Sequence, residues 1–98
     1  MKVRLPHNLE PAEVRRRLEE RKGEIVSYFP AGMASLESRW MGEDHMDFVV
    51  AIAGQRIKGS VDIAEDHVVI DVNLPLILSF LNSKIESSVR KEGTRLLT

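Results

Sequence analysis

The sequence predicts an α+β fold in which an antiparallel meander is covered on one face by two helices. Two observations indicate this class. Between residues 34 and 72, four runs alternate apolar and polar side chains, and short turn signals separate them. Near each end of the chain, another segment carries apolar residues at helical spacing. With a short strand at the N-terminus, the expected order is β-α-β-β-β-β-α.

The N-terminal segment predicts that short strand followed by a helix. "KVRLP" alternates, with Val3 and Leu5 on one side, and its proline ends the strand. Asn8 is a suitable N-cap, and apolar side chains then follow a helical period from Pro11 to about Phe29. The next four residues, "PAGM", are expected to end the helix.

The central region predicts four strands of one meander. Each run places its apolar residues on one face, so one face of the sheet is buried and the other is charged. Short segments such as "GED" and "AED" provide the turns between them. The four runs are "ASLESRWM", "MDFVVAI", "RIKGSVDI" and "HVVIDV".

The segment "NLPLILSFLNSKIESSV" predicts a final helix with Asn73 as its N-cap. The apolar residues that share one stripe of this helix are Leu74, Ile77, Leu78, Leu81, Ile85, Val89 and Leu96. Leu76 and Phe80 lie roughly opposite the stripe, so the first two turns are apolar nearly all round. Asn82 and Lys84 interrupt the run well before the length that a membrane span needs. Leu76 and Phe80 are either covered by the "PAGM" loop or the first strand, or exposed as a patch for a hydrophobic partner.

These elements fit a two-layer sandwich in one domain, residues 1–98, with both helices on the apolar face of the sheet. It is a short helix-grip-like arrangement, in which the C-terminal helix lies along a curved sheet. The chain has 98 residues, 43% hydrophobic and 30% charged, and contains no cysteine, which excludes disulfides and thiolate catalysis. A net charge of -1 gives no general attraction to nucleic acid. No secretory signal is apparent at the N-terminus, so we expect a cytoplasmic protein.

Few residues suggest chemistry. "EDHM" and "EDHV" each combine two carboxylates with a histidine, but Glu-Asp is also ordinary hairpin sequence, and no histidine pair has zinc-like spacing. We therefore expect neither a metal nor a cofactor. His7 is expected to contact a helix end rather than to act as a general base. The three consecutive arginines of "RRR" are expected to pair along the helix, as Glu13–Arg17, Glu19–Arg15 and Glu20–Arg16. We expect a protein without catalytic activity.

Taken together, these segments resemble the polyhydroxyalkanoic acid system proteins, small bacterial proteins associated with polyhydroxyalkanoate storage genes. The matching features are "PHNL", "AEVRRRLEE", "RIKGSVDIAEDHVVIDVNLP", "KIES" and the closing "RLL", roughly from Val3 to Leu97. The resemblance implies a cytoplasmic role in polyester storage, at the granule surface or in its control, and it provides no catalytic residues. The chain departs from the long Ala- and Lys-rich helices usual in granule-coating phasins.

Two functions follow as hypotheses. The first is a noncatalytic accessory or binding protein of polyhydroxyalkanoate storage, with Leu76 and Phe80 as the patch that meets a granule or another protein of the system. Whether the chain forms a homodimer is left open by the sequence. The alternative is a carrier of a small hydrophobic ligand, such as an acyl chain, in a pocket between the final helix and the sheet. Gly59, on the inward face between Ile57 and Val61, would leave room for that pocket.

Overall fold

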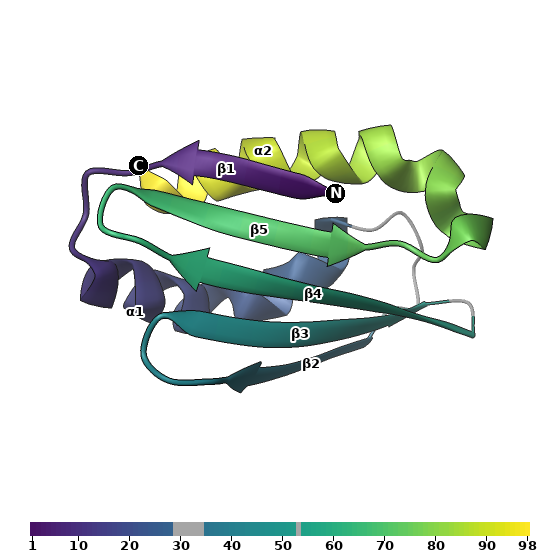
Figure 1. Cartoon of the computed structure of the whole chain (residues 1–98), viewed down its shortest axis with the longest axis horizontal. Coiled ribbons are helices and arrows are strands. Elements are labelled where there is room, and N and C mark those ends of the chain that lie inside the picture. The colour runs from purple at the N-terminus through teal and green to yellow at the C-terminus, as the bar shows by residue number, and fades with distance from the viewer. Residues whose placement is uncertain (29–34, 53) are drawn as a thin grey trace.

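A computed structural model describes residues 1–28, 35–52 and 54–98, and it confirms the α+β class (Figure 1). Five strands form one antiparallel sheet in the order β1-β5-β4-β3-β2. The strands are β1 (Lys2–Pro6), β2 (Ser35–Trp40), β3 (His45–Ile52), β4 (Gln55–Ile63) and β5 (His67–Asn73). The helical elements are α1 (Pro11–Arg21), η1 (Lys22–Tyr28), η2 (Leu76–Leu81) and α2 (Asn82–Leu97), where η denotes a 3₁₀ helix.

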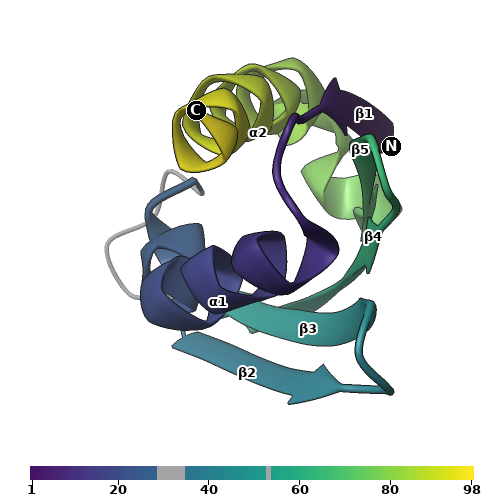
Figure 2. The same ribbon diagram turned by 90° about the vertical axis from the view of Figure 1, so that its left-hand side faces the viewer.

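The meander predicted from the alternating runs is present as β2 to β5, and β1 adds a fifth strand beside β5. In that pair Val3 lies opposite Ile70 and Leu5 opposite Val68. The sheet curves, and both α helices lie on its concave side (Figure 2). The apolar face of every strand is therefore directed toward the helices, while the charged face is directed to solvent.

The hydrophobic core lies between these two layers. β3 shows the pattern most clearly, because its even-numbered residues from Met46 to Ile52 are all buried. From the helix layer, α1 contributes Val14 and Leu18, and α2 contributes a buried row at intervals of four residues. That row is Ile85, Val89, Gly93 and Leu97.

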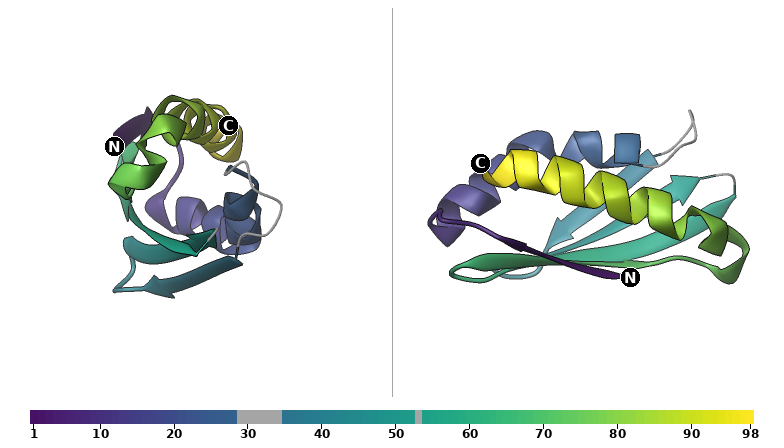
Figure 3. Two further views of the ribbon diagram at one scale, coloured as in Figure 1. Left: turned by 90° about the vertical axis from the view of Figure 1, so that its right-hand side faces the viewer. Right: turned by 90° about the horizontal axis from the view of Figure 1, so that it is seen from above.

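The helix α2 approaches β1 closely at Gly93. A Cβ atom at this position would lie 2.4 Å from Cδ1 of Leu5, so the glycine permits the approach. The side chain of Arg17 in α1 also reaches α2, where its Nη1 donates a hydrogen bond of 2.9 Å to the carbonyl oxygen of Leu96. Seen from above, α2 runs along the sheet beside α1 (Figure 3). Both helices thus form one connected layer.

The first helix differs from its prediction. Its α-helical part ends at Arg21 and continues as η1, and Asn8 is not the N-cap, because Glu10 occupies that position without a side-chain cap. Gly23 lies at the change, where its lack of a side chain weakens an α-helix and a tighter 3₁₀ turn is common. Phe29 and the "PAGM" segment lie outside the described residues.

The final helix differs more. Asn73 belongs to β5 rather than capping a helix, and Pro75 stands at the N-cap of η2. The α-helix begins only at Asn82. Because a 3₁₀ helix has three residues per turn, Ile77 does not share a face with Leu78 and Leu81 as it would in an α-helix. Ile77 is 68% exposed, so its place in the predicted core stripe was wrong.

Among the described residues, Gly59 does not leave the open space expected for a pocket. The ring of Phe48 packs directly against this glycine, and a Cβ atom at residue 59 would lie 2.2 Å from Phe48 Cζ and 2.8 Å from the carbonyl oxygen of Asp71. An apolar cavity between α2 and the sheet has a volume of about 40 Å³. Ligand pockets are roughly 300 Å³ or more, so this cavity does not suit an acyl chain.

We predict that Gly59→Ala destabilises the fold by about 1–3 kcal/mol, because the added methyl group displaces the Phe48 ring and meets backbone. Gly23→Ala is the matched control, since nothing lies within 4 Å of a Cβ atom there, and it should be neutral or stabilising. Denaturant unfolding of both variants measures the difference. Equal stabilities would show that Phe48 does not pack as described.

Candidate functional site

The most distinctive surface feature is a group of exposed apolar side chains on η2. Leu76 is 91% exposed, Ile77 68% and Phe80 77%. We call these three residues the apolar patch. Large side chains of this kind are usually buried, so three exposed within five residues are a candidate contact surface.

The backbone of η2 explains why these side chains point outward. The carbonyl oxygen of Pro75 accepts a hydrogen bond of 2.8 Å from the amide of Leu78, which starts the 3₁₀ turn. Residues three apart share a face of such a helix, so Leu78 and Leu81 lie together and pack against the core. Ile77 and Phe80 share a different face, which is in solvent.

The patch lies at the end of the sheet where β5 finishes, opposite the end that carries the β2–β3 turn (Figure 1). Ser79, Asn82 and Ser83, which are also exposed, give it polar neighbours. The patch itself contains no titratable or nucleophilic group. Its three side chains therefore offer apolar contact and no acid–base or nucleophilic group.

The two residues predicted for this patch, Leu76 and Phe80, are both exposed, and the prediction did not include Ile77. The sequence signal for Ile77 is its spacing: it lies three residues before Phe80, shortly after Pro75. That spacing places them on one face of a 3₁₀ turn, whereas an α-helical period assigns Ile77 to the core.

His7 has a structural role at the other end of the sheet from the patch, near the start of β5. Its ring is buried, Nδ1 accepts a hydrogen bond of 3.1 Å from the amide of Leu9, and Nε2 lies 2.9 Å from the carbonyl oxygen of Ala64. Both contacts are satisfied by the neutral ring with its proton on Nε2. The imidazole ties the segment before α1 to the β4–β5 turn, so its contacts are not to the helix itself.

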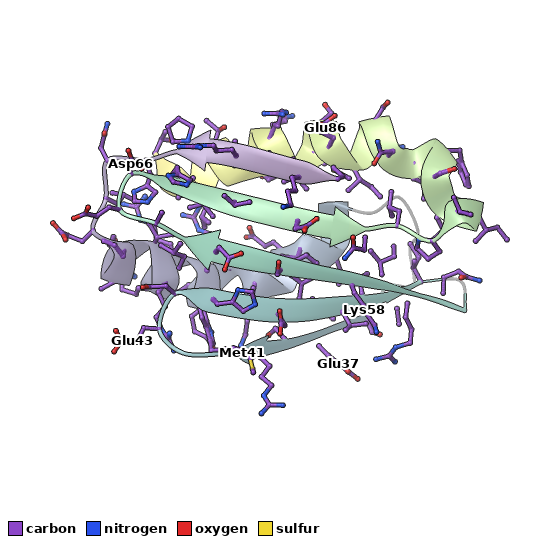
Figure 4. The ribbon with its side chains drawn as sticks, viewed as in Figure 1. Glu37, Met41, Glu43, Lys58, Asp66 and Glu86 are labelled. Atoms are coloured by element: carbon purple, nitrogen blue, oxygen red, sulfur yellow. The ribbon has the colours of Figure 1, made fainter. Side chains whose placement is uncertain are left out.

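The two Glu-Asp-His turns do share one end of the sheet, where Figure 4 labels Glu43 and Asp66. The amide of Ile63 donates to the carbonyl oxygen of Asp44 at 2.8 Å, which joins the two turn regions. Their histidines are not brought together: His45 belongs to β3, and His67 to β5, with β4 between them. Within residues 1–28, 35–52 and 54–98, no three histidine or carboxylate side chains are placed to hold a metal ion.

His45 instead lies between two carboxylates on the outer face of the sheet. Its Nδ1 contacts Asp62 of the adjacent strand β4, and its Nε2 lies 2.7 Å from Oδ1 of Asp47. Hydrogen bonding to Asp62, followed by that to Asp47, raises the pKa of His45 above its ordinary value. The charged imidazolium can donate to both carboxylates at once.

We predict that NMR titration of His45 gives a pKa above about 6.5, the usual value, and that Asp62→Asn lowers it more than Asp47→Asn. Because the folded pKa is raised, the stabilisation is complete below the unfolded pKa and is lost as pH rises through the folded pKa. An unchanged His45 pKa in Asp62→Asn would contradict this assignment.

The arginines of "RRR" make three different kinds of contact. Arg16 and Arg17 share Glu13, at 2.6 and 3.2 Å, and the hydrogen bond from Arg16 contributes most to lowering the pKa of Glu13 to about 2. Arg16 also pairs with Glu20, as predicted. Arg15 does not hydrogen-bond Glu19, because its guanidinium stacks on another side chain.

Arg15 lies over the ring of Trp40, 4.1 Å from the ring centroid, and donates to the carbonyl oxygens of Gly42 and Glu43. Glu19 accepts hydrogen bonds from Trp40 Nε1 at 2.6 Å and from Lys22 at 2.8 Å. The charged face of α1 therefore fixes the end of β2 and leaves no cluster of unpaired arginines for a phosphate.

No helix among the described residues is both long and apolar enough to cross a membrane. A family model described as "putative polyhydroxyalkanoic acid system protein" matches residues 1–97, nearly the whole chain. Comparison with curated proteins and with solved structures gave no match.

Proposed function

The chain belongs to the family of polyhydroxyalkanoic acid system proteins, and from that membership we propose that it is a noncatalytic binding protein of polyester storage. In this proposal, the apolar patch of Leu76, Ile77 and Phe80 contacts the polyester surface of a storage granule in the cytoplasm. The exposure of all three side chains is the observation that carries the proposal.

The chemistry of the patch suits such a surface. A polyester particle is largely apolar and offers a broad area rather than a single small molecule. Burying a Leu, Ile or Phe side chain stabilises binding by about 2 kcal/mol, so the three together provide roughly 6 kcal/mol before the cost of association. A single copy should therefore bind weakly and reversibly. The binding should also persist at high salt, because no ion pair is required.

The acyl-carrier alternative has less support. The space beside Gly59 is filled by Phe48, and the cavity under α2 is far smaller than a ligand pocket. The patch, by contrast, is already exposed and needs no opening of the core.

We predict that Leu76→Glu with Phe80→Glu weakens binding to protein-free polyhydroxyalkanoate particles roughly a thousandfold, since two buried apolar contacts are lost. The melting temperature should change little, because both positions are highly exposed. Met41→Glu is the matched control. Met41 is also a large exposed side chain, 48% exposed, but it follows β2 at the opposite end of the sheet (Figure 4).

The measurement is co-sedimentation with the particles at low and high salt. Equal binding by wild type and the double variant would contradict the proposal, as would equal loss in Met41→Glu. Binding to native granules but not to protein-free particles would assign the patch to another protein of the system. A changed oligomeric state in the double variant would assign it to a second copy of the chain.

A further inference from the structure

The outer edge of β2 is a surface that the proposed function does not use. β2 is the last strand in the sheet order, and β3 is its one strand partner among the described residues. A strand at a sheet edge presents unpaired amide and carbonyl groups, to which another strand can add.

The backbone geometry identifies which groups point outward. The amide of Met41 donates to the carbonyl oxygen of His45 at 2.8 Å, so residue 41 directs its hydrogen bonds toward β3. These directions alternate along an antiparallel strand. Leu36, Ser38 and Trp40 therefore present their amide and carbonyl groups to the free edge.

The side chains of this strand form a self-complementary pattern. Centred on Ser38, the sequence "LESRW" reads apolar, acidic, polar, basic, apolar. Glu37 and Arg39 are exposed on the outer face, while Leu36 and Trp40 are half-buried on the helix side. We propose that two copies of the chain pair through antiparallel β2 strands about a two-fold axis at Ser38, which joins their sheets into one.

In this register, each outward backbone group finds a partner. Ser38 pairs with Ser38 of the second copy, and Leu36 pairs with Trp40 in both directions, all as hydrogen-bonded pairs. Glu37 lies opposite Arg39 of the second copy twice, as non-hydrogen-bonded pairs, in which opposing side chains are closest. Two ion pairs and two aliphatic–aromatic contacts are formed.

The charges also exclude the neighbouring registers. If the two-fold axis is moved to residue 37, Glu37 lies opposite Glu37 of the second copy. If it is moved to residue 39, Arg39 lies opposite Arg39 of the second copy. Like charges directly opposite each other destabilise a strand pair. In both of these registers the outward-directed backbone groups could still pair. The side-chain charges therefore select the register centred on Ser38.

The other edge of the sheet does not show this pattern. The outward groups of β1 belong to Lys2, Arg4 and Pro6, because Met1 and His7 direct their hydrogen bonds to β5. Pairing of two β1 strands would oppose positive charges, and the proline provides no amide donor. β1 is thus protected against self-association, whereas β2 is not.

Trp40 is already held in place for this contact. Its Nε1 donates to Glu19, and Arg15 covers one face of its ring. The side chain therefore loses little freedom when Leu36 of a second copy packs against it. An interface of one strand pair is small, and we expect a dissociation constant roughly in the micromolar range.

The first test uses charge reversal and the purified protein alone, so its outcome is independent of polyester binding. Glu37→Arg leaves two arginines facing two arginines, and Arg39→Glu leaves two glutamates facing two glutamates. Each variant should dimerise at least about tenfold more weakly than wild type. An equimolar mixture of the two variants should restore the dimer, because every opposing pair is then of opposite charge.

Sedimentation velocity across the micromolar range measures these states, and thermal melting checks that each variant is folded. The weak Glu37–Arg56 pair, at 3.8 Å and highly exposed, should add little to stability. A monomeric wild type, or a mixture that associates no better than the separate variants, would overturn the proposal.

The second test reads the register directly. The chain has no cysteine, so a single introduced thiol is unique. Glu37→Cys mixed with Arg39→Cys should form an interchain disulfide under mild oxidation, because opposed non-hydrogen-bonded residues have Cα atoms about 4.5 Å apart. Each variant alone should cross-link much more slowly. Equal rates in the mixture and in the separate variants would refute this register.

Discussion

The close approach of α2 to β1 is the contact on which the arrangement depends. α1 and α2 must together cover the apolar face of five strands, and α2 does so by lying over the edge formed by β1 and β5. Gly93 permits this position, since any side chain there would meet Leu5. Arg17 then joins the end of α2 to α1. α2 is held in its C-terminal half by these two contacts, and η2 lies between β5 and the other end of α2. Among the described residues, η2 packs Leu78 and Leu81 against the core and leaves the three side chains of the apolar patch exposed.

The sequence allowed the sheet to be predicted well because one face of each strand is buried. Alternation in "MDFVVAI" and "RIKGSVDI" has only one register that buries the apolar set. The helices were harder to predict, because α and 3₁₀ helices share local sequence preferences. They differ in the number of residues per turn and therefore in which residues lie on the same face. Ile77 was therefore assigned to the core, whereas Leu76 and Phe80 were placed off the core stripe and are exposed. Gly59 was expected to leave open space because it has no side chain. The sequence does not show that the ring of Phe48, on the neighbouring strand, occupies that space.

The polar residues that looked most chemical are used by the fold itself. His7 binds backbone groups through both ring nitrogens, and His45 contacts a carboxylate on either side. Glu13 satisfies two arginines, while Arg15 and Glu19 hold Trp40. The two histidines, Arg15 and Glu19 each hold two segments together, whereas Glu13 pairs within α1. Beyond them, the described residues offer exposed apolar side chains on η2 and an edge strand, β2, with one strand partner.

In the proposed dimer, the apolar patch and the β2 edge would reinforce each other. A two-fold axis through Ser38, perpendicular to the sheet, keeps both helix layers on the same side and places the two patches at opposite ends of the joined sheet. Each patch alone binds weakly, because three side chains provide little more than the cost of association. When one patch of a dimer is bound to a broad surface, the second patch is kept at a high local concentration near that surface. The dimer therefore binds far more tightly than a single patch. A small ligand cannot engage both ends. The proposed dimer would thus favour an extended apolar surface as the partner proposed for the patch.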